Sequence, residues 1–295
     1  MHTVLDLFSG IGGFSLGLER TGGFKTIAFC EQDAPARQVL DKHWPDVTKY
    51  SDIRNLTYEE LRADGIIPSV ICGGFPCQDV SKSNPINRDG VKGKKSGLWK
   101  EMFRLISDVH PTWVIAENVS ALRVRGLALV LQDLSSLGYC VEWHCIPAGA
   151  CGAPHRRDRI WIIAHSQGGQ VADSYGPHGE GAGCSIGVQE KLSDSYSGGC
   201  NGIPKSPLAN TISKRQQRQG QSGRPVRTEA IINREAVRAF YGRVKGFWET
   251  EPNVGRVADG VSRRSHRLRQ LGNAVVPQIP QLIGEQIMHY ERSAM

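Results

Sequence analysis

The first 165 residues alternate between short apolar runs and longer amphipathic segments, and this alternation limits the fold more than any other feature. Helical periodicity lies near Gly13 to Arg20, Pro35 to His43, Leu98 to Ser107 and Leu127 to Leu137. The apolar runs expected to form strands are Thr3 to Phe8, Thr26 to Cys30, Ser69 to Cys72, Trp113 to Ala116, Cys140 to Ile146 and Arg159 to Ala164. Strands that alternate with helices predict an α/β fold with a doubly wound, mostly parallel sheet.

Sheets of this kind bind their ligands at the carboxyl ends of the strands. Four residues with useful chemistry fall at predicted strand ends, namely Asp6, Glu31, Cys77 and Glu117. We therefore expect a ligand site at that edge of the sheet.

The stretch from Asp6 to Gly13 is rich in glycine, follows a strand and opens a helix, as in sites for nucleotide-type cofactors. It lacks the full Gly-x-Gly-x-x-Gly spacing, so a simple tight turn is the alternative. Glu31 favours the cofactor interpretation, because a carboxylate after the second strand can accept both ribose hydroxyls. Asp52 and Ile53 can hold an adenine amino group and cover its ring.

Cys77 stands in a Gly/Pro loop, Gly73 to Gln78, where a cysteine adds little packing and is useful mainly as a thiolate. Downstream, an apolar run delivers Glu117, and a basic turn carries Arg157 and Arg159. Taken singly, these residues are compatible with a core cysteine, a surface carboxylate and a basic turn. Together they resemble the site of enzymes in which a thiolate adds to carbon 6 of cytosine and makes carbon 5 nucleophilic.

In that reaction Glu117 can supply a proton or hydrogen bond at ring nitrogen 3. The two arginines can bind the base oxygen and orient the carboxylate. The catalytic candidates are therefore Cys77, Glu117, Arg157 and Arg159.

These motifs, in this order and followed by Gly272 to Val276, resemble the bacterial and phage type of DNA cytosine carbon-5 methyltransferases. The resemblance covers residues 3 to 165 and about 254 to 290. It implies a Rossmann-like methyltransferase sheet with a smaller target-recognition domain, S-adenosylmethionine as cofactor, and a target base flipped out of duplex DNA. His155 departs from the family, which often has Gln there.

The resemblance also implies the cofactor-binding positions. They are Phe8, Gly10, Ile11, Gly13, Glu31, Asp52, Ile53, Gly74, Pro76, Leu98, Asn273 and Ala274. No His or Cys set has zinc spacing, so no metal site is expected.

The net charge is +7, and the basic residues cluster. Residues 205 to 228 hold six Lys or Arg and no acid, and residues 255 to 273 hold five Arg against the single acid Asp259. Clustering favours a nucleic-acid partner over a solvated surface or a disordered tail. The loop from Val80 to Gly97 is expected to close over a flipped nucleotide, with a mobile surface loop as the alternative. The DNA-binding candidates are Ser81, Lys82, Arg88, Lys214, Arg215 and Arg218.

Three regions are expected along the chain. The resemblance implies that residues 1–165 are the catalytic, S-adenosylmethionine-binding domain and that residues 166–253 are the target-recognition region. Its first part, up to residue 228, is rich in Gly and Ser and has too little apolar matter for a core of its own. Residues 254–295 are expected to return to the catalytic domain and end in a helix that begins near Pro277.

Several expectations concern the cell. No run of about 18 apolar residues occurs, so no membrane span is expected. No secretion signal is evident, and the eight cysteines fit free thiols in a cytoplasmic protein. We expect a monomer that acts on double-stranded DNA, with a restriction endonuclease for the same site as a candidate partner.

Other functions stay open at this point. A tRNA cytosine-5 methyltransferase would use the same chemistry, and a catalytically silent DNA-binding protein would keep the same fold. A nicotinamide-dependent oxidoreductase is disfavoured by the incomplete glycine pattern and the Pro-Cys-Gln loop. No code links the recognition region to a DNA sequence.

Overall fold

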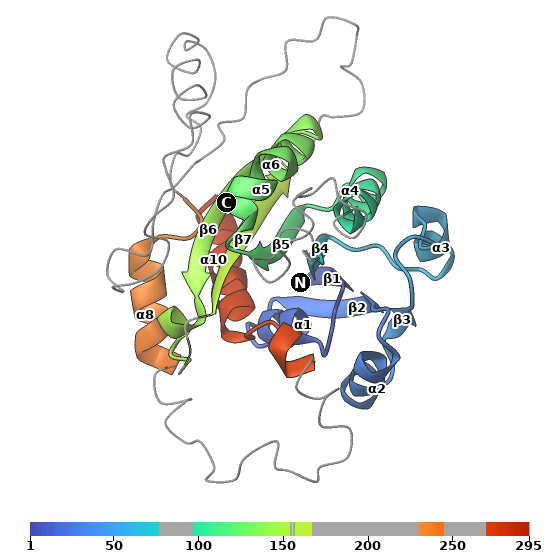
Figure 1. Cartoon of the computed structure of the whole chain (residues 1–295), viewed down its shortest axis with the longest axis horizontal. Coiled ribbons are helices and arrows are strands. Elements are labelled where there is room, and N and C mark those ends of the chain that lie inside the picture. Colours follow the sequence, from blue (N-terminus) through green and yellow to red (C-terminus); the bar gives the residue numbers. More distant parts are fainter. Residues whose placement is uncertain (77–96, 154, 156, 167–229, 245–269, 295) are drawn as a thin grey trace, which may run out of the picture.

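The computed structural model describes residues 1–76, 97–153, 155, 157–166, 230–244 and 270–294. Its strands form one sheet in the order β3-β2-β1-β4-β5-β7-β6 (Figure 1). The strands are β1 (His2–Leu7), β2 (Phe24–Cys30), β3 (Thr48–Tyr50), β4 (Val70–Gly74), β5 (Trp113–Val119), β6 (Tyr139–Pro147) and β7 (Asp158–Ser166).

Strands β1 to β5 pair in parallel, whereas β7 is antiparallel to both of its neighbours. The prediction of an α/β fold with a mostly parallel sheet is therefore confirmed. The strand bounds differ from the predicted ones by a few residues, and one of these differences concerns the site. β5 continues past Ala116 because its antiparallel pairing with β7 runs on to the pair Val119 and Arg159. Glu117 consequently lies within a strand instead of after it.

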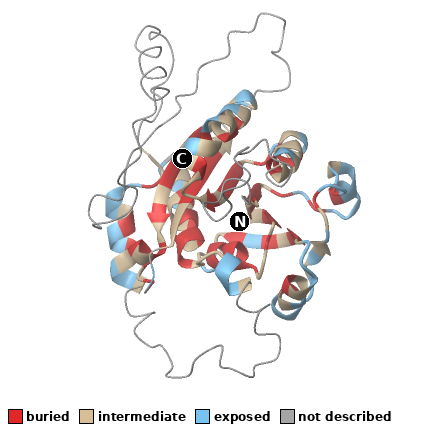
Figure 2. Cartoon of the chain, viewed as in Figure 1, coloured by how far each residue is buried: buried red, intermediate tan, exposed pale blue. Residues whose placement is uncertain are grey.

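Helices cover both faces of the sheet. They are α1 (Gly13–Glu19), α2 (Ala34–His43), α3 (Tyr58–Ala63), α4 (Leu98–Val109), α5 (Leu122–Arg125), α6 (Leu127–Ser136), α8 (Arg234–Val244) and α10 (Gln278–Ala294), with the 3₁₀ turn η2 (Ala148–Cys151). Side chains alternate along each strand, so that Ile71 joins one hydrophobic cluster with α4 and α6 while Val70 joins another with α1, α8 and α10. The buried residues accordingly concentrate on the strands and on the inner faces of the helices (Figure 2).

Helix α8 belongs to the region predicted for target recognition, yet it packs on the core of the catalytic domain. Val237 and Phe240 are buried in the same cluster as Ile283 of α10, and Figure 1 shows α8 beside α10. The carboxylate of Glu142 on β6 accepts hydrogen bonds from the backbone N–H of Ile231 (2.9 Å) and Ile232 (3.3 Å) just before the helix. The predicted boundary at residue 253 thus lies beyond a helix that shares the catalytic core.

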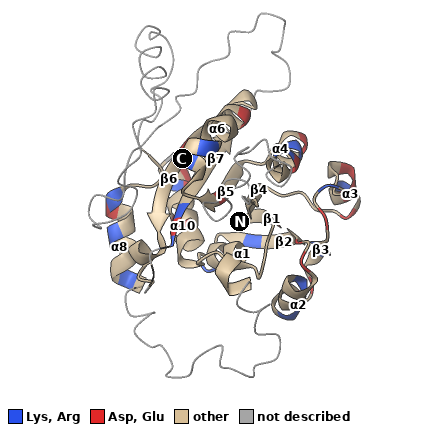
Figure 3. Ribbon diagram, viewed as in Figure 1, with Lys and Arg blue, Asp and Glu red and all other residues tan. Residues whose placement is uncertain are grey.

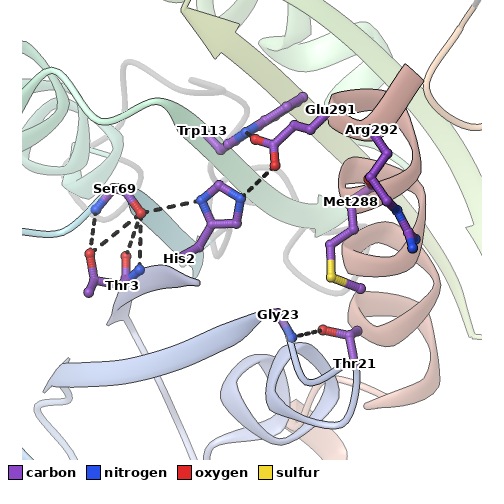
Figure 4. Close-up of polar contacts among 9 residues, drawn as sticks. All are labelled: His2, Thr3, Thr21, Gly23, Ser69, Trp113, Met288, Glu291 and Arg292. Atoms are coloured by element: carbon purple, nitrogen blue, oxygen red, sulfur yellow. Dashed lines mark hydrogen bonds and ion pairs between the residues drawn. The ribbon is translucent and has the colours of Figure 1, made fainter. Parts of the chain in front are cut away.

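A polar contact joins the two ends of the described chain at the amino edge of the sheet (Figure 4). Glu291 on α10 contacts Nε2 of His2 and accepts a hydrogen bond from Nε1 of Trp113, both at 2.9 Å. Below it, Gly23 leaves room for the sulfur of Met288, which a larger side chain would displace. The C-terminal helix is thereby fixed to β1 and β5 at the edge away from the predicted ligand site.

Among the described residues, no helix has the length and apolar character needed to cross a membrane. Cys30, Cys72, Cys145 and Cys151 are free thiols, as expected. Cys140 differs from the expectation, because it is disulfide-bonded. It lies half-buried on β6, the edge strand of the sheet.

Candidate active site

The strand order brings the predicted site residues to one edge of the sheet. The chain reverses its direction of progress between the neighbours β1 and β4, which is where doubly wound sheets form a ligand crevice. Leu7 at the end of β1 pairs with Cys30 of β2 and with Gly73 of β4. Gly74 in turn pairs with Glu117. The loops that follow these strands therefore start side by side.

The glycine-rich loop after β1 takes an unusual backbone path. Phe8, Gly10 and Gly12 have φ values of 53°, 54° and 86°, in the left-handed region that favours glycine. Phe8 is the only one of the three that is not glycine, so its backbone is strained. Such strain often marks a ligand site. A methyl group on Gly10 would meet nothing within 4 Å, so the loop backbone there faces open space that a ligand can enter.

Glu31 fastens this loop to the end of β2. Its Oε2 accepts a hydrogen bond from the N–H of Gly10, and its Oε1 accepts one from the N–H of Asp33, both at 2.7 Å. Each carboxylate oxygen has a second acceptor position. Glu31 can therefore bind ribose hydroxyls without giving up either backbone contact.

Two other predicted cofactor residues are engaged within the protein. Asp52 forms an ion pair with Arg54, whose Nε lies 2.9 Å from Oδ1, and this contact lowers the pKa of the Asp52 carboxyl. Ile53 is only 4% exposed and packs in the hydrophobic cluster that contains α4. Few of its atoms face a ligand in this conformation.

Cys77 lies outside the described residues, and Phe75 and Pro76 are the last described residues before it. Phe75 is buried against Trp99 of α4, with ring centroids 5.1 Å apart. The Nδ2 of Asn118 donates to the carbonyl oxygen of Phe75 at 3.1 Å, and its Oδ1 accepts from the N–H of Val119 at 2.8 Å. The start of the Cys77 loop is therefore fixed to β5.

Sequence reasoning assigned no role to Asn118, which is only 2% exposed. The available signal was a polar amide next to Glu117, just beyond an apolar strand run, because a buried amide requires hydrogen-bond partners.

Glu117 and Arg159 form an ion pair on the neighbouring strands β5 and β7. The Nε of Arg159 lies 2.8 Å from Oε1 of Glu117, and the two side chains are 23% and 13% exposed, respectively. A methyl group on Gly74 would lie 3.0 Å from Oε2 of Glu117, so the carboxylate rests against the end of β4. Burial raises the pKa of Glu117, and the charges of Arg159 and Arg157 oppose this shift.

Arg157 has a different set of partners from Arg159. Its Nη1 donates to the carbonyl oxygen of Gly272 and its Nη2 to that of Ala274, both at 2.6 Å. The sequence predicted that both arginines bind the base oxygen and orient the carboxylate. The structure brings Arg159 to Glu117 and directs the guanidinium of Arg157 to the backbone of the returning C-terminal segment.

The remaining predicted residues fall into two groups. Gly13 is buried, Ile11, Leu98 and Ala274 are half-buried, and Asn273 is exposed. The predicted DNA contacts all lie outside the described residues: Ser81, Lys82, Arg88, Lys214, Arg215 and Arg218.

Comparison with known proteins identifies the family. The sequence model of the C-5 cytosine-specific DNA methylase family matches residues 2–196. The chain therefore belongs to this family, which confirms the resemblance noted from its motifs.

Relatives of known type agree with this assignment. The Type II methyltransferase M2.BsuMI of Bacillus subtilis (strain 168) is 37% identical over 171 residues, which cover 55% of this chain and 41% of that protein. M.Sau3AI of Staphylococcus aureus is 35% identical over 180 residues, which cover 56% and 43%. The match thus spans less than half the length of these relatives.

Two solved structures share the fold over nearly the whole chain. The Entamoeba histolytica methyltransferase EhMeth aligns with a TM-score of 0.58 and 16% identity, covering 98% of both chains. A Spodoptera frugiperda DNMT2 variant aligns with a TM-score of 0.57 and 13% identity, covering 98% of this chain and 100% of the other. At these identities the likeness concerns the fold alone.

Proposed function

We propose that this protein transfers a methyl group from S-adenosylmethionine to carbon 5 of a cytosine in duplex DNA, through a covalent adduct of Cys77. The observation that carries the proposal is the position of Glu117. Paired with Arg159, it rests against the end of β4, the strand that leads into the Cys77 loop. The glycine-rich loop and Glu31 follow the strands next in order.

The described residues fit S-adenosylmethionine. When bound, the cofactor supplies an electrophilic methyl group on its sulfonium. Glu31 has free acceptor positions for the ribose hydroxyls, and the open space beside Gly10 admits a ligand close to the backbone. The Asp52 carboxylate is 19% exposed and has further acceptor positions for an adenine amino group.

The protein residues act on the base in sequence. The target cytosine leaves the base stack, because a stacked ring hides its face from a thiolate. The Cys77 thiolate forms a bond to carbon 6 while Glu117 gives a hydrogen bond or proton to ring nitrogen 3. Carbon 5 then takes the methyl group, loses its proton to a base, and the electron pair of that C–H bond expels Cys77 by elimination.

Arg159 holds Glu117 in place through this sequence. Burial raises the pKa of Glu117, which favours the protonated form that nitrogen 3 requires, while the adjacent guanidinium limits the shift. The arginine therefore keeps the carboxyl oriented, and burial lets it hold a proton.

The partners follow from the family and remain part of the proposal. The relatives are named as Type II methyltransferases, which supports a restriction endonuclease with the same recognition site as a functional partner. We propose that the protein acts as a monomer. Residues within 166–253 that lie outside the catalytic core would select the DNA sequence.

The substitution Cys77→Ser tests the proposal. A serine hydroxyl is almost wholly protonated at neutral pH, so the variant should lose methyl transfer and keep its binding of DNA and cofactor. Transfer of a labelled methyl group to duplex DNA measures the loss, with tRNA assayed in parallel. The unsubstituted protein should form a denaturation-resistant adduct with duplex DNA that carries 5-fluorocytosine, because fluorine blocks the elimination. Substantial turnover by the serine variant would contradict the role of Cys77.

A further inference from the structure

We infer that Arg157 is a positioning residue, which docks the returning C-terminal segment onto the cofactor loop and so sets cofactor affinity without acting on the base. The inference deepens the proposed function and rests on it for the identity of the ligand. We define the return segment as residues 270–277, the described residues that directly precede α10.

The first observation is the way in which Arg157 holds the return segment. Residues 270–273 form a helical turn, and the carbonyl groups at the end of such a turn have no partner within it. The guanidinium bridges two carbonyl oxygens of this stretch, those of Gly272 and Ala274, at 2.6 Å each. A positive charge at the carboxyl end of a helical turn also interacts favourably with the peptide dipoles there.

The second observation is the anchoring of Arg157 itself. It immediately precedes β7, where Asp158 pairs with Pro147 of β6. Its carbonyl oxygen accepts a hydrogen bond from the N–H of Ala148 at 3.3 Å. Its φ of 33° lies in the left-handed region, which a residue with a side chain adopts only when its surroundings hold it there. From this position the side chain reaches the return segment, where both of its hydrogen bonds are made.

The third observation is what the return segment touches. A methyl group on Gly13 would lie 2.6 Å from the carbonyl oxygen of Val275, so the two backbones are in direct contact where α1 begins. Gln270 reaches the other side of the loop, with its Nε2 3.4 Å from Oδ2 of Asp33. Asp33 in turn donates its N–H to Glu31. The segment that Arg157 holds therefore packs against both elements of the proposed cofactor site.

The two arginines, which are two residues apart, therefore have different roles. Arg159 pairs with Glu117, the carboxyl proposed to face the base. Arg157 binds the backbone of the return segment, which packs against the cofactor loop. The sites for the base and the cofactor are thus supported by two arginines at the start of β7, one just before the strand and one within it.

The variants Arg157→Lys and Arg159→Lys form a matched pair for the test. Lysine keeps the positive charge but lacks the rigid planar fork that reaches two carbonyl groups at once. Cofactor binding is measured by titration calorimetry with S-adenosylmethionine and no DNA, so that no group acting on the base contributes. Arg157→Lys should raise the dissociation constant about tenfold, the loss of one hydrogen bond to a charged group. Arg159→Lys should leave it unchanged and instead slow methyl transfer at saturating cofactor.

Hydrogen exchange supplies a readout that needs neither cofactor nor activity. The N–H of Ala274 donates to the carbonyl of Gln270 at 2.8 Å, within the segment that Arg157 holds. In the protein without ligands, Arg157→Lys should speed exchange of this amide about tenfold, and Arg159→Lys should not. Amides of β1 serve as the internal control for global unfolding.

The outcomes separate the inference from the proposed function. If Arg157→Lys leaves cofactor affinity and exchange at Ala274 unchanged but slows methyl transfer, the inference is overturned. Arg157 would then act on the base. A wild-type protein that binds no S-adenosylmethionine would overturn the proposed function, and the cofactor role of Arg157 with it. Wild-type binding with the predicted losses in Arg157→Lys supports both.

Discussion

Asp6 shows how burial changes the chemistry of a single side chain. It is fully buried at the end of β1, and its Oδ2 accepts hydrogen bonds from Oγ (2.7 Å) and N–H (3.3 Å) of Ser15. Oδ1 has no hydrogen-bond partner among the described residues. Burial raises the pKa of Asp6 from 3.8 to about 7, although the bonds from Ser15 oppose the shift. Asp6 therefore links the end of β1 to α1, but its burial makes the charged form of the carboxyl unfavourable.

This shift predicts a pH-dependent stability. Below pH 3.8 the carboxyl is protonated in both the folded and the unfolded chain. Between pH 3.8 and about 7 the unfolded chain ionises first, so the stability that Asp6 contributes is lost as the pH rises through this window. Asp6→Asn removes the ionisation. The free energy of unfolding of this variant, relative to the wild type, should therefore rise by roughly 2–3 kcal/mol between pH 5 and pH 8. Urea unfolding at several pH values measures the difference.

Asp46→Asn provides the control, because Asp46 is exposed and loses little hydration on folding. The pH dependence specific to Asp6 is the difference in stability between the two variants over the same pH range. A constant difference between them would mean that Asp6 is charged in the folded protein.

Helices α1 and α10 pack closely because Gly17 of α1 has no side chain at their contact. A methyl group on Gly17 would overlap the carbonyl oxygen of Pro277 and lie 2.9 Å from Cβ of Pro280. Both of these groups are held by the start of α10, whose Ile279 and Ile283 are buried against α1. The backbone of α10 therefore cannot move away without exposing its own apolar side chains.

Gly17→Ala should accordingly destabilise the protein by about 1–3 kcal/mol, the usual cost of excess volume in a packed interior. Gly242→Ala is the matched control, since Gly242 also lies in a helix and a methyl group there meets nothing within 4 Å. That variant should be neutral or stabilised by up to about 1 kcal/mol, because alanine favours helices. Thermal unfolding compares the two. Equal stability would show that α1 and α10 separate easily.

The charge of the molecule as a whole bears on its proposed DNA partner. The net charge is +7, and the basic stretch from residue 205 to 228 contains no acid. Among the described residues, α8 carries Arg234, Arg238 and Arg243, and Figure 3 shows basic residues along this helix. In the sequence, α8 follows the basic stretch, so further arginines lie where the chain packs on the core of the sheet domain.

Joint neutralisation of Lys214, Arg215 and Arg218 by Ala should weaken DNA binding and flatten its salt dependence. Each phosphate contact contributes roughly 0.9 to the slope of log affinity against log salt, so the loss of three should reduce the slope by about 2.7. DNA titrations at several salt concentrations measure the slope, and cofactor affinity should not change.

The control for this experiment neutralises Lys25, Lys42 and Arg292. These exposed residues lie toward the amino edge of the sheet, away from the proposed site. Their loss removes the same charge and should leave the slope unchanged. If both triple variants retain the wild-type slope, DNA recognition lies elsewhere, and the arginines from Arg256 to Arg269 become the next candidates.

Much of this architecture is encoded locally and could be predicted from the sequence. The alternation of apolar runs and amphipathic segments determined the α/β class, because the periods of strands and helices depend only on near neighbours along the chain. The same patterns placed Glu31 and the glycine-rich loop at strand ends, and the order of the motifs was sufficient for the family. In residues 1–165 the bounds of the predicted strands and helices differ from the structure by a few residues at most, whereas β3, α3 and α5 had no predicted bounds.

Only the folded chain decided which residues meet. Arg157 and Arg159 are the same residue type two positions apart, and the sequence does not distinguish them. Their partners, Gly272 and Glu117, depend on where the return segment packs and on how β7 pairs with β5. The position of α8 on the core and the contact between His2 and Glu291 likewise join residues far apart in the chain. Such contacts result from burying apolar faces against one another, and local periodicity does not specify the partner of a face.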